Sequence, residues 1–481
     1  MFKLLVAILL LASTASAADS DGKNFVFSYG YFTIPTRNVS LSSSAQANIY
    51  ILATTSSEAQ CNLRYQLNGR KTPMVSQFYA VPGRESIVNL PANNLIKTLS
   101  PTASYVSGQL NQDQRIFVDC TEPVKVFAEF FDQESVGGDM WLVPSKQIAG
   151  TDYIFSIPPS IDFQASMITI VPTVETATNI LVSAHIYFNG EVKHSQVYSV
   201  NGSIGSKALN LLTYSQNEIG NYTIALTSSS PILVNLIAPF STKGNDAKNC
   251  VGCKESYVSY MPIPSKNEVC PRKGVAGDKR IISADFTMDI FFSSPLLTST
   301  CTKEAIVSLV TENFKDGTTA ITVNKDVQTS FAMNSHYVAT SSVNGKIPTY
   351  RFGGAKADRF NPSTTLSGKI AHYVPSMDEW VTGTTEFFTF MFHCVLEVYA
   401  EDTGSTFDLS MDGGVINPRL FLKSEKIKFF GKPFVRYEIS VSGERQHTFE
   451  AKRKYVAYVV CPKIEPSNVA YGYLTGFNYK V

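Results

Sequence analysis

Short runs of alternating polar and apolar residues recur along the chain, and several end at a turn signal. Residues 62–67 alternate in this way and lead directly into Asn68-Gly69. The apolar run 186–188 leads into Asn189-Gly190. A period of two places alternate side chains on opposite faces of a β-strand, and Asn-Gly favours the backbone conformation of a tight hairpin. The pattern therefore predicts antiparallel hairpins.

Two segments also repeat one pattern around a proline. In residues 116–126 an isoleucine lies seven positions before Pro123, and an apolar run follows the proline. Residues 224–234 repeat this arrangement around Pro231. Upstream, each copy has an Asn-Gly pair followed by a Tyr-x-Val-x-Gly run. Two copies of one β-rich unit are therefore expected, and such repetition is more typical of a scaffold than of a catalytic pocket.

A second repeat marks the entry into new β-units. Val-Pro-Ser at 143–145 precedes Gly150-Thr151, and the same tripeptide at 374–376 precedes Gly383-Thr384 with two more residues between. Because proline restricts the residue before it to an extended conformation, both segments are predicted to be extended connections.

These patterns divide the chain into a leader, four β-units and a linker. We expect an all-β fold of tandem antiparallel β-sandwich-like units, arranged as two halves on either side of the polar linker. The expected divisions are a signal peptide at 1–17, units at 24–140, 141–243, 257–370 and 371–481, and the linker at 244–256.

The first 17 residues have the parts of a secretory signal. Lys3 supplies a positive charge, residues 4–12 are apolar, and Ala15-Ser16-Ala17 fits the cleavage rule for small residues. No segment provides the roughly 18 uninterrupted apolar residues that a membrane span needs. The mature chain is therefore expected to be secreted and extracellular, without a membrane span.

Charge argues against two classes of partner. The formal net charge is +1, and it falls to 0 (1 − 1) when Lys3 leaves with the signal peptide. Charges of both signs are scattered without long runs. This balance is not typical of proteins that bind nucleic acid or an anionic membrane surface.

All the cysteines follow the signal segment, and an even number in an exported chain predicts four disulfides. They are Cys61, Cys120, Cys250, Cys253, Cys270, Cys301, Cys394 and Cys461. We expect one bond inside the first unit, Cys61–Cys120, and one inside the fourth, Cys394–Cys461.

The other four cysteines cluster where the linker meets the third unit. A bond between Cys250 and Cys253 would close a very small strained ring, so each is expected to bond to Cys270 or Cys301. Redox activity or half of a zinc site is the alternative for the Cys-Val-Gly-Cys motif. Three sequons are candidate glycosylation sites. They are Asn38, Asn201 and Asn221.

Several short motifs resemble those of the IgGFc-binding protein N-terminal domain family. Residues 140–153 resemble its "LPxxxLGxxY" signature, 229–234 its "S-x-x-P-V-x-V" strand, and 411–413 its "LDG" turn. Residues 447–476 resemble its closing "H-x-I…F-x-V…YGYPxG" run, with Leu474-Thr475 where the family commonly has Pro-Ala. The resemblance implies a secreted, mucus- or matrix-associated protein. It does not carry over antibody binding, because no residue here matches an Fc-contacting site.

One short motif in the chain could indicate enzyme activity. Residues 402–406 spell the Asp-Thr-Gly-Ser-Thr loop of a pepsin-like protease, but that chemistry needs two such carboxylates. No second copy occurs, and the 79 residues after Asp402 (481 − 402) are too few for a second lobe. We interpret the loop as a polar turn.

Histidines and tryptophans give no site with the spacing of a ligand set. His185 and His194 flank one hairpin and could face each other, but a surface pair is the favoured interpretation over a metal site. Trp141 and Trp380 could form a carbohydrate platform, and packing between units is favoured instead. No catalytic, cofactor-binding or metal-binding residue is predicted.

The sequence therefore favours a secreted, glycosylated, non-enzymatic binding or structural protein of an extracellular or mucus-like matrix. Its expected partners are extracellular proteins or glycans. The alternatives are a glycan-binding or pathogen-facing defence protein and, less favoured, a secreted hydrolase that depends on Asp402.

Overall fold

β-Strands dominate the chain, and most pair antiparallel, which confirms the predicted all-β fold class. Among the described residues, the helical segments are α1 (Ala92–Leu95) and three 3₁₀ turns, η1 (Lys146–Ile148), η2 (Met377–Glu379) and η3 (Pro418–Leu420). The computed structural model describes residues 18–33, 41–132, 134, 137–160, 165–215, 220–242, 256–265, 267–268, 278–293, 296–297, 304–311, 319–324, 326–333, 335–342, 346–356, 366–390, 393–406, 408–464 and 469–479.

The first sheet has the order β5-β4-β9-β3-β6, with β1 and β10 also paired to β9. Its strands are β1 (Gly22–Ser28), β3 (Gln46–Ala53), β4 (Ala59–Tyr65), β5 (Met74–Ala80), β6 (Ser86–Pro91), β9 (Arg115–Asp132) and β10 (Gly137–Val143). A short parallel pair, β2 (Tyr31–Phe32) with β7 (Thr98–Leu99), lies outside it.

The second sheet has the order β14-β13-β16-β12-β15-β8, with β11 and β17 paired to β16. Its strands are β8 (Tyr105–Asn111), β11 (Gly150–Ser156), β12 (Ser166–Pro172), β13 (Ile180–Phe188), β14 (Glu191–Val200), β15 (Ala208–Tyr214), β16 (Tyr222–Ser241) and β17 (Ser256–Tyr260). Strand β8 precedes β9 in the chain but pairs with β15, so the first segment of the chain contributes an edge strand to the second sheet.

The third region contains two four-stranded sheets, β19-β25-β22-β23 and β24-β20-β26-β27, and a short parallel pair of β18 with β21. The strands are β18 (Asn267–Glu268), β19 (Asp278–Ser283), β20 (Thr287–Phe292), β21 (Leu296–Leu297), β22 (Glu304–Thr311), β23 (Thr319–Asn324), β24 (Thr329–Ala332), β25 (Tyr337–Ser342), β26 (Thr349–Lys356) and β27 (Leu366–Tyr373).

The fourth region is one sheet of order β31-β30-β34-β29-β33-β32, with β28 and β35 paired to β34. Its strands are β28 (Val381–Thr389), β29 (Cys394–Glu401), β30 (Leu409–Met411), β31 (Gly414–Val415), β32 (Phe421–Phe429), β33 (Lys432–Val441), β34 (Arg445–Ile464) and β35 (Val469–Leu474).

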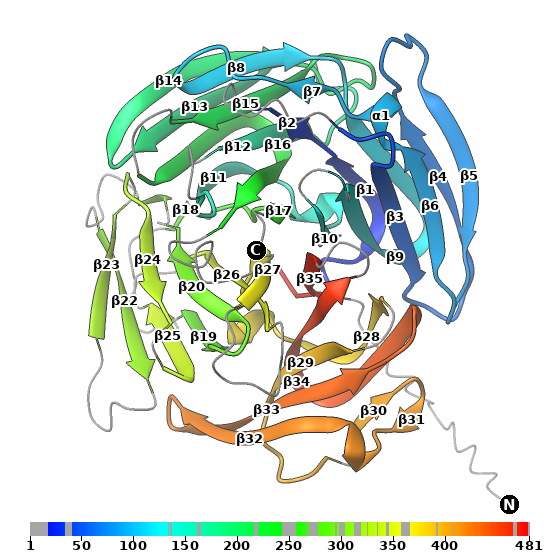
Figure 1. Ribbon diagram of the computed structural model, residues 1–481, viewed down its shortest axis with the longest axis vertical. Helices are drawn as coiled ribbons and strands as arrows, with labels where there is room; N and C mark the ends of the chain where they lie inside the picture. Colours follow the sequence, from blue (N-terminus) through cyan, green and yellow to red (C-terminus); the bar gives the residue numbers. More distant parts are fainter. Residues whose placement is uncertain are drawn as a thin grey trace, which may run out of the picture.

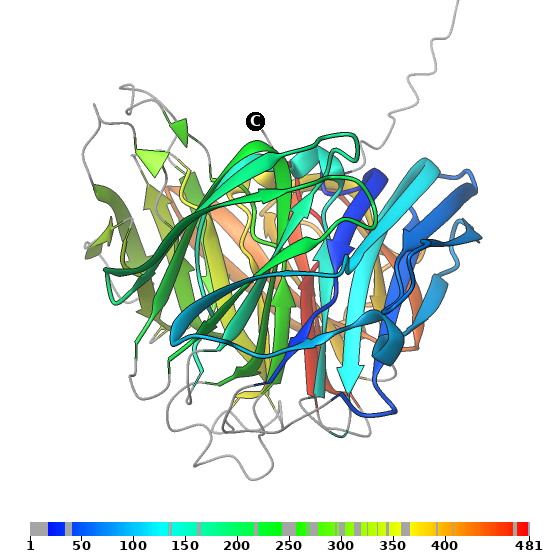
Figure 2. The ribbon, with the colours of Figure 1, turned by 90° about the horizontal axis from the view of Figure 1, so that it is seen from above.

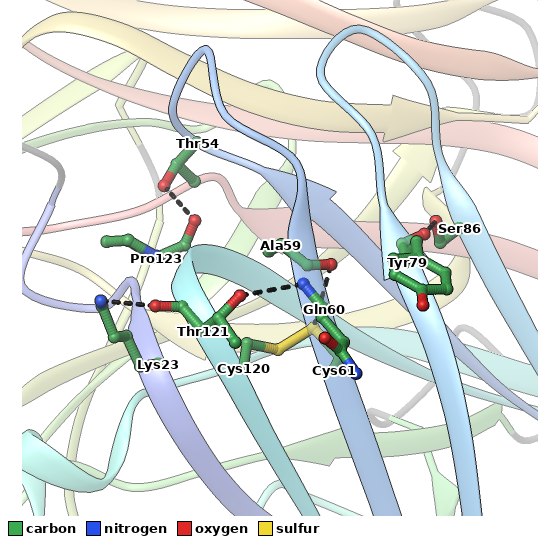
Figure 3. The surroundings of a disulfide bond; sticks show 10 residues. All are labelled: Lys23, Thr54, Ala59, Gln60, Cys61, Tyr79, Ser86, Cys120, Thr121 and Pro123. Carbon is green, nitrogen blue, oxygen red and sulfur yellow. Dashed lines mark hydrogen bonds between the residues drawn. A yellow bond between two sulfur atoms is a disulfide. The ribbon is translucent and has the colours of Figure 1, made fainter.

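The repeated prolines lie in the middle of long strands that change partners. Strand β9 pairs with β1 and β4 around its first half, and with β3 and β10 around its second half. The Thr54 hydroxyl donates to the Pro123 carbonyl at 3.0 Å (Figure 3), and the Thr173 hydroxyl donates to the Pro231 carbonyl of β16 at 2.9 Å. The two proline motifs therefore have the same local structure.

The four regions surround a common axis. Figure 1 looks down this axis and shows the regions in chain order around it, with β10, β17, β27 and β35 closest to the centre. Each of these inner strands packs against two of the others, β10 and β27 both contacting β17 and β35. Figure 2 shows the inner strands running through the molecule. The arrangement resembles the radial packing of β-propeller blades.

Large side chains fill the axis. The space left there is about 30 Å³, bounded by residues that include Trp141, Tyr260, His372 and Tyr473. Two inner strands are also joined by a buried carboxylate, because Asp139 of β10 accepts a hydrogen bond from the backbone N–H of Ser259 in β17 at 2.8 Å. Burial raises the pKa of Asp139 well above its usual value. The centre of the ring is therefore a packed core.

The two ends of the described chain close the ring. The backbone N–H of Ser20 donates to the Phe477 carbonyl at 3.1 Å, and the N–H of Phe477 donates to Ser20 Oγ at 3.1 Å. The fully buried Lys125 of β9 forms an ion pair with Asp21 at 3.1 Å and donates to the Thr385 hydroxyl of β28 at 3.0 Å. These contacts join the first and fourth sheets.

Two predicted disulfides are confirmed. Cys61 in β4 bonds Cys120 in β9, directly opposite in the strand register (Figure 3). Cys394 at the start of β29 bonds Cys461 in β34. Each bond joins adjacent strands of one sheet and closes a loop of 59 or 67 residues. The other four cysteines, Cys250, Cys253, Cys270 and Cys301, lie outside the described residues.

Candidate binding site

Both tryptophans pack inside the protein, as predicted. Trp141 is 2% exposed and makes an edge contact with Tyr29, with ring centroids 5.6 Å apart. Trp380 is 3% exposed and makes an edge contact with Phe434 at 5.9 Å. Neither presents its face at the surface, so the two do not form a carbohydrate platform.

The Asp402 motif forms a polar turn. One Asp402 carboxylate oxygen accepts the backbone N–H of Gly404 at 2.8 Å, and the other lies 3.4 Å from Lys426 Nζ. The Gly404 hydrogen bond is the main cause that lowers the pKa of Asp402. A second carboxylate sharing a proton would instead leave one of the two pKa values raised.

His185 and His194 do not face each other across the hairpin, although the sequence allowed this. His185 lies opposite Ser195 in the β13–β14 register, whereas His194 lies opposite Ile186. His185 contacts the hydroxyls of Ser183 and Ser195, and His194 contacts the hydroxyl of Tyr198 at 2.9 Å. Each ring is thus satisfied separately. Among the described residues, no group of three or more His, Cys, Asp or Glu side chains is placed to hold a metal ion.

Two of the three sequon asparagines are described, and both are exposed. Asn201 accepts the backbone N–H of Asn179 through Oδ1 at 3.0 Å, and the Asn221 backbone donates to the side chain of Asn189. Asn38 lies outside the described residues.

A fully buried ion cluster joins the third and fourth regions. Glu397 of β29 accepts hydrogen bonds from Arg351 of β26 at 2.7 Å and from Arg436 of β33 at 2.9 Å. Burial alone would raise the pKa of Glu397, but the two guanidinium groups outweigh it and lower this pKa. Burial, with Arg351 nearby, lowers the pKa of His372 well below its usual value. The cluster is closed to solvent and its charges are paired, which is typical of a structural role.

A hollow lies beside this junction. It is a cavity of about 250 Å³ at the boundary between β19 and the fourth sheet. It is formed by the start of β19, the η2 turn, the end of β29, the β32–β33 hairpin and the middle of β34. The other cavities found among these residues measure about 40 Å³ or less. The cavity of about 250 Å³ has room for part of a ligand.

Three lysines line the cavity, each from a different element. Lys279 lies in β19, Lys432 begins β33, and Lys454 lies in β34. Lys279 and Lys454 are half-buried and Lys432 is exposed. None of the three forms an ion pair with a carboxylate of the described residues. The exposed carboxylates of Asp378 and Glu401 also line the cavity, which leaves one net positive charge.

The apolar part of the cavity includes an unusual turn residue, Phe430. Tight turns at Asn189-Gly190 and Asp412-Gly413 each have positive φ at both residues, and Phe430-Gly431 has the same geometry with φ of 54° and 75°. Asparagine and aspartate tolerate this conformation, but a bulky aromatic does so at a cost. The Phe430 ring lies 5.2 Å from Lys279 Nζ. The strained backbone thus places an aromatic ring beside a cation.

Trp380, which lines the cavity, carries a buried hydrogen-bond donor without a described partner. Its indole Nε1 is buried and finds no acceptor among the described residues. A buried donor without a partner costs about 1–3 kcal/mol, so such groups occur more often where water or a ligand can be bound. The three cavity lysines could not be predicted to lie together, because they come from distant segments of the chain. Locally, Phe-Gly at the tip of the β32–β33 hairpin is the unusual feature of the sequence.

Comparisons with known proteins leave the family of this chain open. No family model matches it, and no curated protein matches it. A solved structure, the tetra-tandem repeat in the extending region of a large adhesion protein, is similar over 89% of this chain and 93% of its own, at 10% identity and a TM-score of 0.10. That likeness is too weak to bear on fold or function. The resemblance to the IgGFc-binding protein N-terminal domain stays a prediction.

The described residues include no helix with the length and apolar character needed to cross a membrane.

Proposed function

We propose that this protein is a secreted, non-enzymatic binding protein of an extracellular or luminal, mucus-like matrix, with extracellular proteins or glycans as partners. The observation that carries the proposal is the cavity lined by Lys279, Lys432 and Lys454, whose ammonium groups have no carboxylate partner among the described residues. Charged groups left without an internal partner are available to an external one.

Three further features support the proposal. The disulfides Cys61–Cys120 and Cys394–Cys461 belong to an oxidising environment, such as that of exported proteins. Asn201 and Asn221 are exposed at sequons, as glycosylation requires. Asp402, the hook for a hydrolase, is held in a turn by Gly404 and Lys426.

The experiment is biolayer interferometry of the purified full-length protein on immobilised mucus glycoproteins and on extracellular matrix proteins. We expect saturable binding to at least one of these surfaces, with a heat-denatured sample as control. A peptidase and glycosidase panel runs in parallel with the Asp402→Ala variant. Absence of binding to all surfaces, or turnover that the Asp402→Ala variant loses, would overturn the proposal.

A further inference from the structure

The cavity lysines, which have no carboxylate partner in the described part of the chain, contrast with the basic groups at other junctions. Lys125 is paired with Asp21 between the first and fourth sheets, and Arg436 is paired with Glu397 inside the fourth. In these two ion pairs the nitrogen of the cation lies 3.1 Å and 2.9 Å from a carboxylate oxygen. Lys279 instead has only the ring of Phe430 as its described partner. The cavity therefore has cationic donors that can hold an anion from outside.

The cavity also has hydrogen-bond acceptors, which limit the classes of ligand that could bind there. Asp378 and Glu401 are exposed carboxylates on its rim. Ionised carboxylates only accept hydrogen bonds, so they would repel a strand of continuous negative charge and would bind hydroxyl groups. A ligand that satisfies both sets carries one anionic group and several hydroxyls.

Phe430 and the cavity volume add two limits. The ring of Phe430 is half-buried and provides an apolar contact, against which the C–H face of a sugar ring can pack. The volume of about 250 Å³ is somewhat below the roughly 300–1,000 Å³ of drug-sized ligand pockets. It suits one sugar residue, with the rest of a chain outside.

The strain at Phe430 is the second, independent sign of a site. Asparagine or glycine would form the β32–β33 turn with less strain, as Asn189 does in the β13–β14 turn. Non-glycine residues with positive φ cluster where function requires their side chain in one place. Here the Phe430 side chain lines the cavity, as does Trp380.

We infer that this cavity binds an acidic saccharide, a sugar residue that carries a sulfate or carboxylate group. The lysines hold the anion, Asp378 and Glu401 accept hydroxyl hydrogens, and Phe430 contacts the ring. The inference rests on the proposed function, since it names the ligand class of the same site.

The test is isothermal titration calorimetry of the full-length protein with four probes. They are the methyl glycoside of sulfated N-acetylglucosamine, methyl glucuronide, neutral methyl N-acetylglucosaminide and inorganic sulfate. We expect saturable binding of at least one of the two acidic sugars, and binding at least about tenfold weaker for the neutral sugar, because a hydrogen bond to a charged group contributes that much. Inorganic sulfate is also expected to bind at least about tenfold more weakly than the acidic sugar.

Variants separate the site from the fold. Lys279→Met and Lys454→Met should each weaken binding of the acidic sugar by about tenfold or more. Lys426→Met removes the same charge from the same sheet outside the cavity and should leave binding unchanged. Phe430→Asn suits the turn better, so it should fold at least as well as the wild type and still lose affinity.

Other outcomes would overturn the inference. Equal affinity for neutral and acidic sugars, tighter binding of sulfate alone, or equal losses in Lys426→Met and Lys279→Met would each do so. If the acidic sugars do not bind while the protein still binds a matrix surface, this inference fails and the proposed function stands.

Discussion

Two junctions of the ring begin with the same motif and end with opposite properties. Val-Pro-Ser leads into η1 between the first and second sheets, and into η2 between the third and fourth regions. At η1, Lys146 lies 3.8 Å from both Asp119 and Glu175, and Arg64 pairs with the same two carboxylates at 2.6 and 2.7 Å. At η2 there is a cavity of about 250 Å³ lined by three lysines that form no ion pair with the described residues.

The two junctions differ because the carboxylates beside η1 and η2 have different hydrogen-bond partners. At η2 the buried Glu379 accepts hydrogen bonds from the Tyr373 hydroxyl at 2.6 Å and the Ser376 backbone at 2.9 Å, so it is used inside the junction. At η1, Glu175 faces the cations, and the hydrogen bond from Arg64 lowers its pKa. The shared motif sets the backbone path, and the side chains decide whether a junction is filled or hollow.

The largest effect is expected at the most tightly closed junction, between the first and fourth sheets. Lys125→Met leaves Asp21 buried without its partner, and we expect the free energy of unfolding to fall by about 3–5 kcal/mol. Chemical denaturation measures this. Lys23→Met, which removes an exposed lysine of the same sheet, should cost about 1 kcal/mol or less. Similar losses of unfolding free energy in both variants would show that the buried Lys125–Asp21 pair stabilises the protein no more than an exposed pair does.

The junction between the first and fourth sheets should also make the stability of the protein depend on pH. Burial raises the pKa of Glu386 from 4.5 to about 7, opposed by Lys125 and assisted by Asp21. The folded state thus binds this proton more tightly than the unfolded state, and the stability it contributes is lost as the pH rises from about 4.5 through 7. Glu386→Gln should remove this loss and be more stable than the wild type by about 3 kcal/mol at pH 8. Denaturation at a series of pH values tests this; a constant difference between the two proteins would contradict it.

The comparison of η1 with η2 predicts a smaller effect with a clear sign. Arg64→Met should lower the free energy of unfolding by about 1 kcal/mol, because it breaks a partly exposed network. Lys454→Met at the hollow junction should leave stability unchanged or slightly higher, since no described ion pair is lost. Thermal denaturation of both variants provides the test, and an equal loss at the two junctions would remove the distinction between them.

The smallest effect concerns the strained turn. Phe430→Asn should raise the free energy of unfolding by about 1 kcal/mol at most, because asparagine tolerates positive φ better than phenylalanine. The matched control is Asn189→Phe, which puts the aromatic into the equivalent turn and should lower it by a similar amount. If Phe430→Asn is clearly destabilising, the ring contributes packing rather than strain.

Local patterns predicted much of the fold. The alternation before Asn189-Gly190 gave the β13–β14 hairpin, and the strand positions of Cys61 and Cys120 gave their disulfide. The placement of all four regions around one axis was not predicted, and neither was the pairing of β8 with the second sheet, because both depend on contacts between distant segments. The cavity escaped detection for the same reason, since Lys279 and Lys454 lie 175 residues apart (454 − 279).

The most direct test of the central claim is the reactivity of individual lysines toward reductive methylation, measured by mass spectrometry. In the free protein, Lys279 and Lys454 should react faster than Lys125, which is fully buried and ion-paired with Asp21. The methyl glycoside of sulfated N-acetylglucosamine should slow Lys279 and Lys454 and leave Lys146, at the filled junction, unchanged. Equal rates at Lys279, Lys454 and Lys125, or no protection at the cavity by the acidic sugar, would contradict the account.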